Sequence, residues 1–326
     1  MDVLVLGASG FIGSRVVAAL AARPGYRPVA ASRRAAADGA RIALDATDPV
    51  AVQAAVRNVG AVVNCVAGSE QTMVRATEAL CAAKPVRIVH LSSMAVYGAA
   101  TGTVREDIAP VAPLSGYSQA KLTSEALVQR YVDEGGQAVI LRPTCVFGPG
   151  SAQWTTRIAR LLQARRLGDL GAAGDGCCNL AFIDDVVDTV LAGLEAPSGV
   201  FNVNSSAELS WNQFLLRFAK ALGATPVRRV PTRELRLETR LLAPLRRIGA
   251  KLIDIPATEA ITPSFAALLR QDIRVDASAA MAGLALHPAG LDRMIGAAVQ
   301  WLQISQPDFR EQHAQGHAPS CGHGRG

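Results

Sequence analysis

The chain opens on residues 1–13, MDVLVLGASGFIG, and this stretch decides the fold. The run DVLVL alternates too weakly for a half-exposed strand and predicts a buried parallel strand. Gly7, Gly10 and Gly13 follow it, and the helical pattern SRVVAALAARPG begins directly after them. Such a turn presents free backbone N–H groups at the positive end of a helix. It predicts a pyrophosphate-binding site, where Gly7 allows the tight turn, Gly10 the close approach and Gly13 the helix–strand packing.

Strand and helix patterns alternate through the first two thirds of the chain. Strand patterns recur at PVAAS, AVVNCVA, RIVHLSS and QAVILRP, and helical patterns lie near residues 14–22, 49–58, 70–83 and 117–134. This alternation predicts an α/β fold, a Rossmann-type doubly wound parallel sheet with a smaller, mostly helical C-terminal substrate part. We expect a dinucleotide-binding domain over 1–170, to which 181–203 returns, a substrate-binding part over 171–180 and 204–305, and a disordered tail over 306–326.

Two further helices show start signals. The segment NLAFIDDVVDTVLAGL predicts a strand that turns into a helix, with Asp184 or Asp185 as the N-cap. Ser210 is expected to cap the helix WNQFLLRFAKALG. From about Pro226 the sheet rhythm is lost, and arginines interleave with leucines through the basic segment 228–251.

The basic segment leaves three interpretations open. Its apolar residues fall at helical spacing, and Pro244 would kink or split such a helix. The main interpretation is an amphipathic helix that packs against the rest of the domain. The alternatives are a basic segment that covers an anionic or lipophilic substrate and a helix that lies on a membrane surface. The apolar positions are Leu237, Leu241, Leu245, Ile248 and Leu252. In the tail, His313, His317, Cys321 and His323 are not expected to form a catalytic metal site.

Composition and charge limit the class of protein. The 326 residues are 50% hydrophobic and carry a net charge of +6. No apolar run reaches the roughly 20 residues of a membrane span, and the N-terminus opens on a core strand, so we expect no integral span, no signal peptide and a cytoplasmic location. Nothing resembles a nucleic-acid-binding module, and the charge is interpreted as solvated surface with an anionic cofactor or substrate as a secondary cause. The cysteines lack a CxxC pattern and are expected to be reduced, and no role is assigned to the adjacent pair Cys177 and Cys178.

Tyr117 and Lys121 carry the strongest chemical signal. They stand in SGYSQAKLTSEAL, and because positions i and i+4 share one face of a helix, the phenol and the ammonium can be neighbours. A cation held beside a phenol favours phenolate, so Lys121 is expected to lower the pKa of Tyr117 and make it a better base. An exposed helix pair is the alternative interpretation of this spacing.

A pair of serines ends the predicted strand in RIVHLSSMAVYG. Ser92 and Ser93 lie where parallel α/β sheets bind ligands, and a hydroxyl there can hydrogen-bond a substrate oxygen. A serine that satisfies a turn is the alternative.

The glycine turn, the serine strand and the tyrosine helix occur in the order seen in the extended short-chain dehydrogenase/reductase family, which contains NAD-dependent epimerases and dehydratases. GASGFIG, SSMAVYG, RPTCVFGPG, FIDDVV and LALHPAGLDRMIGAAVQWL each resemble segments of that family. The resemblance implies hydride exchange between a substrate carbinol carbon and nicotinamide C4. Tyr117 would be the acid/base, Ser93 (with Ser92 as the fallback) would orient the oxygen, and Lys121 would tune Tyr117 and hold the nicotinamide ribose.

The resemblance and the residues together predict how a dinucleotide binds. The second strand ends in Ser32, Arg33 and Arg34 without the carboxylate that would bind both ribose hydroxyls, and arginine suits bidentate contact with a phosphate. We therefore expect NADP, with NAD as the alternative. Asp45 resembles the family's adenine-contacting aspartate, whereas a capping role fits Asp48 better. The expected cofactor-binding residues are Gly7, Gly10, Phe11, Ile12, Gly13, Ser32, Arg33, Arg34, Asp45, Ala46, Ala67, Tyr117, Lys121 and Pro143.

Three functions compete for the site. A NADPH-linked carbonyl reductase or dehydrogenase is the main interpretation, since the arginines favour an exchangeable NADPH. A nucleotide-sugar epimerase with tightly bound NAD is the first alternative, whereas dehydration is disfavoured because Met94 and Ala95 stand where dehydratases of the family carry acidic residues. A non-catalytic dinucleotide-binding protein is the second alternative, disfavoured by the presence of Tyr117 and Lys121. The expected partners are a small-molecule substrate and a second copy in a homodimer.

Overall fold

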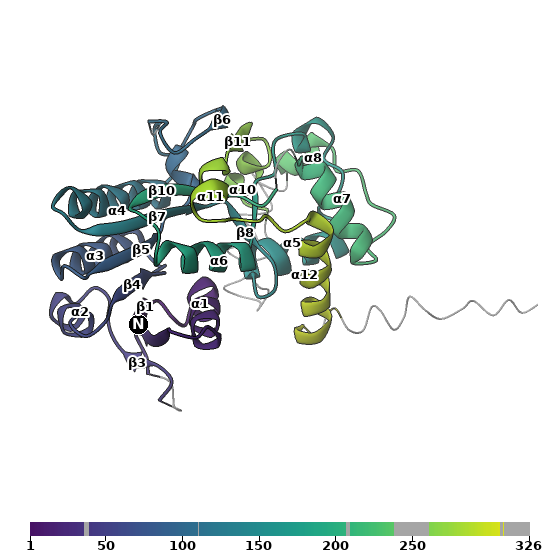
Figure 1. Ribbon diagram of the computed structural model, residues 1–326. Coiled ribbons are helices and arrows are strands. Elements are labelled where there is room, and N and C mark those ends of the chain that lie inside the picture. The colour runs from purple at the N-terminus through teal and green to yellow at the C-terminus, as the bar shows by residue number, and fades with distance from the viewer. Residues whose placement is uncertain (36–38, 110, 207–208, 238–260, 307–308, 310–326) are drawn as a thin grey trace, which may run out of the picture. The chain divides into compact units, whose positions relative to one another are not determined.

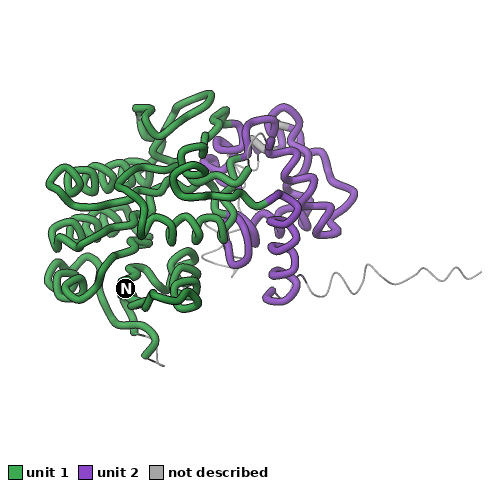
Figure 2. The backbone as a smooth tube through the Cα atoms, in the orientation of Figure 1, with its two compact units in different colours: residues 1–146, 179–208, 271–289 green, residues 147–178, 209–270, 290–326 purple. Residues whose placement is uncertain are grey.

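The computed structural model describes residues 1–35, 39–109, 111–206, 209–237, 261–306 and 309. The chain divides into two compact units, drawn green and purple in Figure 2. Unit 1 comprises residues 1–146, 179–208 and 271–289, and unit 2 comprises residues 147–178, 209–270 and 290–326. The predicted domain boundaries stay a prediction.

A seven-stranded parallel sheet forms the centre of unit 1 (Figure 1). The strand order is β10-β7-β5-β4-β1-β2-β3, so the opening strand β1 lies between β2 and β4. Residues 3–6 of β1 are each 0% exposed, which explains why DVLVL does not alternate: both faces of the strand are covered. The strands are β1 (Asp2–Leu6), β2 (Arg27–Ser32), β3 (Ile42–Ala43), β4 (Ala61–Asn64), β5 (Arg87–Leu91), β7 (Gln137–Pro143) and β10 (Gly199–Val203).

Helices cover both faces of this sheet, which confirms the predicted doubly wound fold. Helices α2 (Pro49–Val56), α3 (Glu70–Ala82) and α4 (Gly116–Asp133) lie on one face, and α1 (Phe11–Ala22) and α6 (Ile183–Gly193) lie on the other (Figure 1). On the first face, Leu80 of α3 and Val128 of α4 belong to one apolar cluster with Ile88 and Ile140 of the sheet. Burial of such side chains contributes about 1.5–3 kcal/mol each and fixes the helices on the strands.

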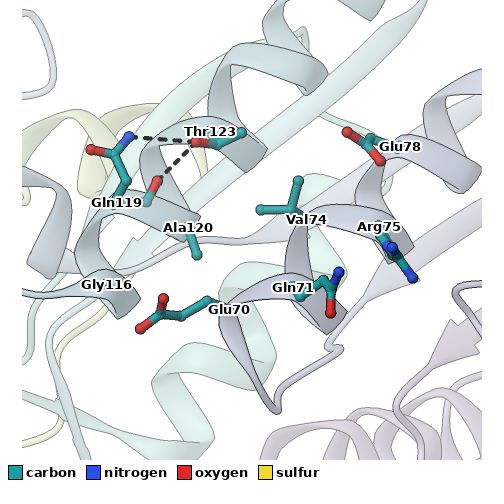
Figure 3. Close-up of a pocket in the computed structure, with 9 residues that line it drawn as sticks. All are labelled: Glu70, Gln71, Val74, Arg75, Glu78, Gly116, Gln119, Ala120 and Thr123. Atoms are coloured by element: carbon teal, nitrogen blue, oxygen red, sulfur yellow. Dashed lines mark hydrogen bonds between the residues drawn. The ribbon is translucent and has the colours of Figure 1, made fainter.

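A groove of about 350 Å³ lies between α3 and α4 (Figure 3). Six of its nine lining residues have polar or charged side chains, and Gln119 and Thr123 are joined by a hydrogen bond along α4. The lining residues are Glu70, Gln71, Val74, Arg75, Glu78, Gly116, Gln119, Ala120 and Thr123.

Shorter elements complete unit 1. A 3₁₀ turn, η1 (Met94–Tyr97), follows β5, and β6 (Gly102–Val104) pairs in parallel with β11 (Ile273–Val275). Strand β8 (Cys145–Phe147) pairs with β9 (Leu180–Phe182), with the Cys145 N–H donating to the Asn179 carbonyl oxygen at 3.2 Å. Helix α11 (Ser278–Gly283) packs on β10.

The predicted N-cap of α6 is wrong. The helix begins at Ile183 with Phe182 as its N-cap, and Asp184 and Asp185 lie within its first turn. The Asp185 carboxylate instead accepts hydrogen bonds from Ser205 Oγ at 2.6 Å and from the Ala289 N–H at 2.9 Å. Its role is to join three distant segments of unit 1. By contrast, Asp48 caps α2 as predicted, accepting from the Val50 N–H at 2.9 Å.

Unit 2 is helical. The predicted cap of α7 is confirmed, since Ser210 and Gln213 form a reciprocal capping box. Phe147, Phe214 and Phe218 form an aromatic core, with the ring centroids of Phe147 and Phe214 5.2 Å apart in an edge-to-face arrangement. The elements are a π-helical turn (Ala152–Thr156), α5 (Arg157–Gln163), a 3₁₀ turn (Gly171–Gly174), α7 (Trp211–Ala221), α8 (Thr232–Leu237), α10 (Pro263–Leu268) and α12 (Leu291–Ser305).

Some predictions fall on residues outside the described part of the chain. These are Pro244, the apolar positions Leu241, Leu245, Ile248 and Leu252, and the tail residues His313, His317, Cys321 and His323. Among the described helices, none is both long enough and apolar enough to cross a membrane.

Candidate active site

The candidate site lies at the carboxyl edge of the parallel sheet. Leu6 of β1 pairs with Asn64 of β4, and Asn64 pairs with His90 of β5. The loops that follow these strands therefore begin at one level, where open α/β sheets bind ligands. The sheet also changes direction of winding between β1 and β4, the position at which such sheets open a crevice.

The glycine turn after β1 is fixed by close backbone contacts. Gly7 has a φ of +77°, and a Cβ there would stand 2.7 Å from the Cys65 carbonyl oxygen. A Cβ on Gly13 would stand 2.3 Å from the Gly7 carbonyl oxygen, and the Gly10 N–H donates to that same oxygen at 2.9 Å. Residues 7 and 13 therefore have no room for a side chain, and the turn stays tight against the loop after β4.

The N-terminus of α1 has no side-chain cap. Gly10 is the N-cap residue and makes no side-chain hydrogen bond, and Phe11 and Ile12 form the first helical turn. An uncapped first turn with a positive dipole end suits the pyrophosphate of a dinucleotide. The residues present therefore fit the predicted cofactor.

A cationic cavity adjoins the glycine turn. It has a volume of about 540 Å³ and is lined by Ser9 of the turn, Ser32, Arg33, Arg34 and Arg41. The Ser32 hydroxyl donates to the Arg34 carbonyl oxygen at 2.6 Å and so fixes the chain at the end of β2. Arg41, which precedes β3, was missed by the sequence analysis because β3 has only two residues and gives almost no pattern. Three arginines thus gather beside the glycine turn, and guanidinium groups suit bidentate contact with a phosphate.

The remaining predicted cofactor residues lie in the loops after β3 and β4 and at the end of β7. Asp45 is exposed, and its carboxylate accepts from the Thr47 N–H at 2.9 Å and from Thr47 Oγ1 at 2.8 Å, which lowers the pKa of Asp45. Ala46 packs against the core, and Ala67 lies exposed in the loop after β4. Pro143 ends β7 and pairs with Val203 of β10. Their contacts with a dinucleotide stay predictions.

Ser93, Tyr117 and Lys121 come together after β5. Ser93 caps the 3₁₀ turn η1, its hydroxyl accepting from the Ala95 N–H at 3.2 Å, and Ser115 caps α4, which carries the other two residues. Burial around its hydroxyl raises the pKa of Tyr117, and a hydrogen bond with the Ser93 side chain opposes that rise. The structure thus brings Ser93, rather than Ser92, to the phenol, whereas the Ser92 hydroxyl is buried among described residues that offer it no hydrogen bond. The pKa of Tyr117 thus lies above its usual value, opposite in direction to the lowering expected from Lys121, and a lower pKa with an oxidised nicotinamide bound stays a prediction.

The Lys121 ammonium lies in a buried pocket beside the phenol. Its Nζ is 5.9 Å from the centroid of the Tyr117 ring and donates to the Leu91 carbonyl oxygen at 2.6 Å. Burial lowers the pKa of Lys121 to about 8, and the nearby Cys65 thiol and Glu125 carboxylate partly oppose this. Lys121 is therefore held at the end of β5, within electrostatic range of Cys65 in the loop after β4.

A buried histidine lies near Lys121 and was missed by the sequence analysis. His90 is 2% exposed, and its Nδ1 lies 3.2 Å from Asn64 Nδ2, so it accepts a hydrogen bond there. Burial and the charge of Lys121 lower the pKa of His90 to about 3. The imidazole is therefore neutral at physiological pH and adds no second positive charge beside Lys121.

Comparison with known proteins shows the family and the fold of this chain. The family model described as "NAD dependent epimerase/dehydratase family" matches residues 3–204. The ADP-L-glycero-D-manno-heptose-6-epimerase of Cupriavidus pinatubonensis is 30% identical, over 65% of this chain and 75% of its own length. The dTDP-4-keto-6-deoxy-D-glucose reductase of Streptomyces niveus is 27% identical, over 70% of this chain and 82% of its own length. A crystal structure of UDP-glucuronic acid 4-epimerase from Bacillus cereus with NAD has a TM-score of 0.71 at 21% identity, over 94% of this chain and 98% of that chain, and so shares the fold.

Proposed function

Since this chain belongs to the NAD-dependent epimerase/dehydratase family, we propose that it moves a hydride between a nicotinamide cofactor and a carbinol carbon of a nucleotide-linked sugar. Membership makes the chain an NAD(P)-dependent enzyme of the short-chain dehydrogenase type, and the non-catalytic interpretation is set aside. The observation that carries the proposal is the convergence of Ser93, Tyr117 and Lys121 at the end of β5, on the same edge of the sheet as the glycine turn.

The substrate class differs from the main expectation drawn from the sequence. Both relatives described above are named for nucleotide-linked sugars, one as an epimerase and one as a reductase. They support the nucleotide-sugar alternative better than a general carbonyl reductase. We therefore propose epimerisation of a nucleotide sugar. Reduction of a keto sugar on the same kind of substrate is the second candidate, favoured by the arginine-lined cavity, which suits an exchangeable NADPH.

The proposed mechanism assigns one task to each side chain. The nicotinamide, when bound, accepts or returns the hydride. Tyr117 removes the proton from the sugar hydroxyl or returns it, and Ser93 holds and orients the same oxygen. The Lys121 ammonium, held at the Leu91 carbonyl, stabilises the phenolate form of Tyr117 and would hold the nicotinamide ribose.

Turnover of nucleotide sugars tests the proposal directly. The cofactor that co-purifies is first identified by native mass spectrometry, and the protein is then incubated with UDP-, dTDP- and ADP-linked hexoses. We expect a new diastereomer in the NMR spectrum without net change in nicotinamide absorbance. Consumption of NADPH in proportion to a 4-keto nucleotide sugar would instead support the second candidate. Reduction of simple ketones by NADPH, with every nucleotide sugar left unchanged, would contradict the substrate class.

We also propose a preference for NADP over NAD, supported by the arginine-lined cavity. Arg34→Ala and Arg41→Ala are each expected to raise the Kd of NADPH about tenfold or more, because hydrogen bonds to charged groups are worth about 1.5–3 kcal/mol. NADH lacks the 2′-phosphate that these arginines would bind, so the Kd of NADH is expected to stay within about twofold. Isothermal titration calorimetry with both cofactors measures the effect.

The matched control is Arg57→Ala, since Arg57 is an exposed arginine at the C-cap of α2 and does not line the cavity. Equal affinity of the wild-type protein for NADH and NADPH would refute the preference. Formation of a homodimer stays a prediction.

A further inference from the structure

A buried ion pair lies one helical turn beyond Lys121. Glu125 and Lys121 are four residues apart on α4, so their side chains share a face with Cβ atoms about 5–6 Å apart. The Glu125 carboxylate does not pair with this lysine. It accepts two hydrogen bonds from Arg142 of β7, at 3.0 Å from Nε and 2.7 Å from Nη2. Both side chains are nearly buried, at 8% and 10% exposure.

The same guanidinium reaches the turn that carries Ser93. Arg142 Nη1 donates at 3.1 Å to the Tyr97 hydroxyl, the last residue of η1, and at 3.1 Å to the Glu106 carbonyl oxygen. The Tyr97 hydroxyl in turn donates to Asn202 Oδ1 at 2.6 Å. Burial alone would lower the pKa of Arg142, but the hydrogen bonds and charge of Glu125 raise it above its usual value, so the guanidinium stays charged.

We propose that Arg142 is a positioning residue that withholds the Glu125 carboxylate from Lys121, so that the ammonium stays at the Leu91 carbonyl and beside Tyr117. A buried carboxylate that loses its partner has a large uncompensated desolvation cost. We therefore expect it to form an ion pair with the nearest cation. Without Arg142, that cation is Lys121 on the same helix face. An ion pair there draws Nζ along the helix, away from the Tyr117 ring. The part of this inference that concerns turnover rests on the proposed function, whereas the part that concerns the Lys121 ion pair does not.

The other groups that face Lys121 do not change charge near its midpoint. Burial raises the pKa of the Cys65 thiol to about 12, and burial lowers the pKa of His90 to about 3. Burial also raises the pKa of Tyr117 above its usual value. Near pH 8 all three are neutral, so a change in the titration of Lys121 reports on Glu125.

The titration of Lys121 can be observed directly. The chain has four lysines, Lys84, Lys121, Lys220 and Lys251, so protein labelled with [ε-¹³C]lysine gives few signals, and Lys121→Arg assigns the one of interest. In the wild-type protein this signal is expected to titrate near 8. In Arg142→Met the midpoint is expected to move toward the ordinary lysine value of about 10.4, and kcat is expected to fall about tenfold or more.

Removing the carboxylate as well separates positioning from simple loss of structure. In the double variant Arg142→Met/Glu125→Gln no carboxylate remains to capture Lys121, so the midpoint is expected to return to or below the wild-type value and kcat to recover relative to the single variant. In Arg142→Lys a single ammonium cannot hold both carboxylate oxygens, so a smaller upward shift of the Lys121 midpoint is expected. This variant tests the inference if Arg142→Met does not fold. The control Arg27→Met removes the exposed pair with Asp2 and is expected to leave the midpoint unchanged.

An unchanged titration midpoint of Lys121 in both Arg142→Met and Arg142→Lys would overturn the inference. It would also be overturned if the double variant had the same low kcat and the same Lys121 midpoint as Arg142→Met. Failure of the proposed function would look different. Nucleotide sugars would then remain unchanged in every variant, while the shift of the Lys121 signal could still be measured.

Discussion

Replacing Tyr117 with Phe is expected to lower kcat on the order of 10²–10⁴-fold, the usual contribution of a general acid/base, while the Kd of the dinucleotide changes by less than about threefold. The change removes one hydroxyl and keeps the ring. Tyr117 is 43% exposed, and its hydroxyl is the group that interacts with Ser93. The substrate oxygen therefore loses its proton donor and acceptor, whereas the glycine turn and the arginine cavity remain as they are.

The measurement combines turnover with cofactor titration on the same preparation. Tyr26→Phe is the matched control, because the Tyr26 hydroxyl bonds Glu195 and lies in a different part of unit 1. We expect this control to turn over at the wild-type rate. If Tyr117→Phe retained more than about half of wild-type kcat, the assigned role of the phenol would be wrong.

Replacing Gly13 with Ala is expected to lower the free energy of unfolding by about 1–3 kcal/mol or more, the usual cost of inserting a carbon into a packed site. The added Cβ would stand 2.3 Å from the Gly7 carbonyl oxygen, 2.9 Å from the Gly7 carbonyl carbon and 3.1 Å from the Ala8 Cα. All three are backbone atoms, so no side chain can rotate away to relieve the contact. The glycine turn itself must shift, and the Kd of the dinucleotide is expected to rise with it.

Gly296→Ala is the control for this prediction. Gly296 also lies inside a helix, α12, but a Cβ there would meet nothing within 4 Å. Alanine is favoured over glycine in a helix interior by about 1 kcal/mol, so this variant is expected to be slightly more stable than the wild type. Urea unfolding followed by circular dichroism compares the two variants. Equal free energies of unfolding for Gly13→Ala and Gly296→Ala would show that the glycine turn can accommodate a Cβ at residue 13, which would contradict the prediction.

The sequence by itself determined the features that depend on neighbours along the chain. The strand and the three glycines lie within thirteen residues, and the helix follows directly. Tyr117 and Lys121 share a helix face because they are four residues apart. The alternation of strand and helix patterns predicted the parallel sheet, because each pattern reports only the local faces that must be buried. The caps at Asp48 and Ser210 were predictable for the same reason.

Only the tertiary structure decided which distant groups meet. Asp185 has the sequence context of a cap, but its carboxylate is engaged by Ser205 and Ala289, so the local rule gave the wrong role. Arg41, which precedes the two-residue strand β3, lines one cavity with Ser9. Glu125 of α4 pairs with Arg142 of β7, between the helix and the sheet. The physical reason is that hydrogen bonds and charges act through space over a few ångströms, whereas sequence patterns record only the periodicity of burial along one element.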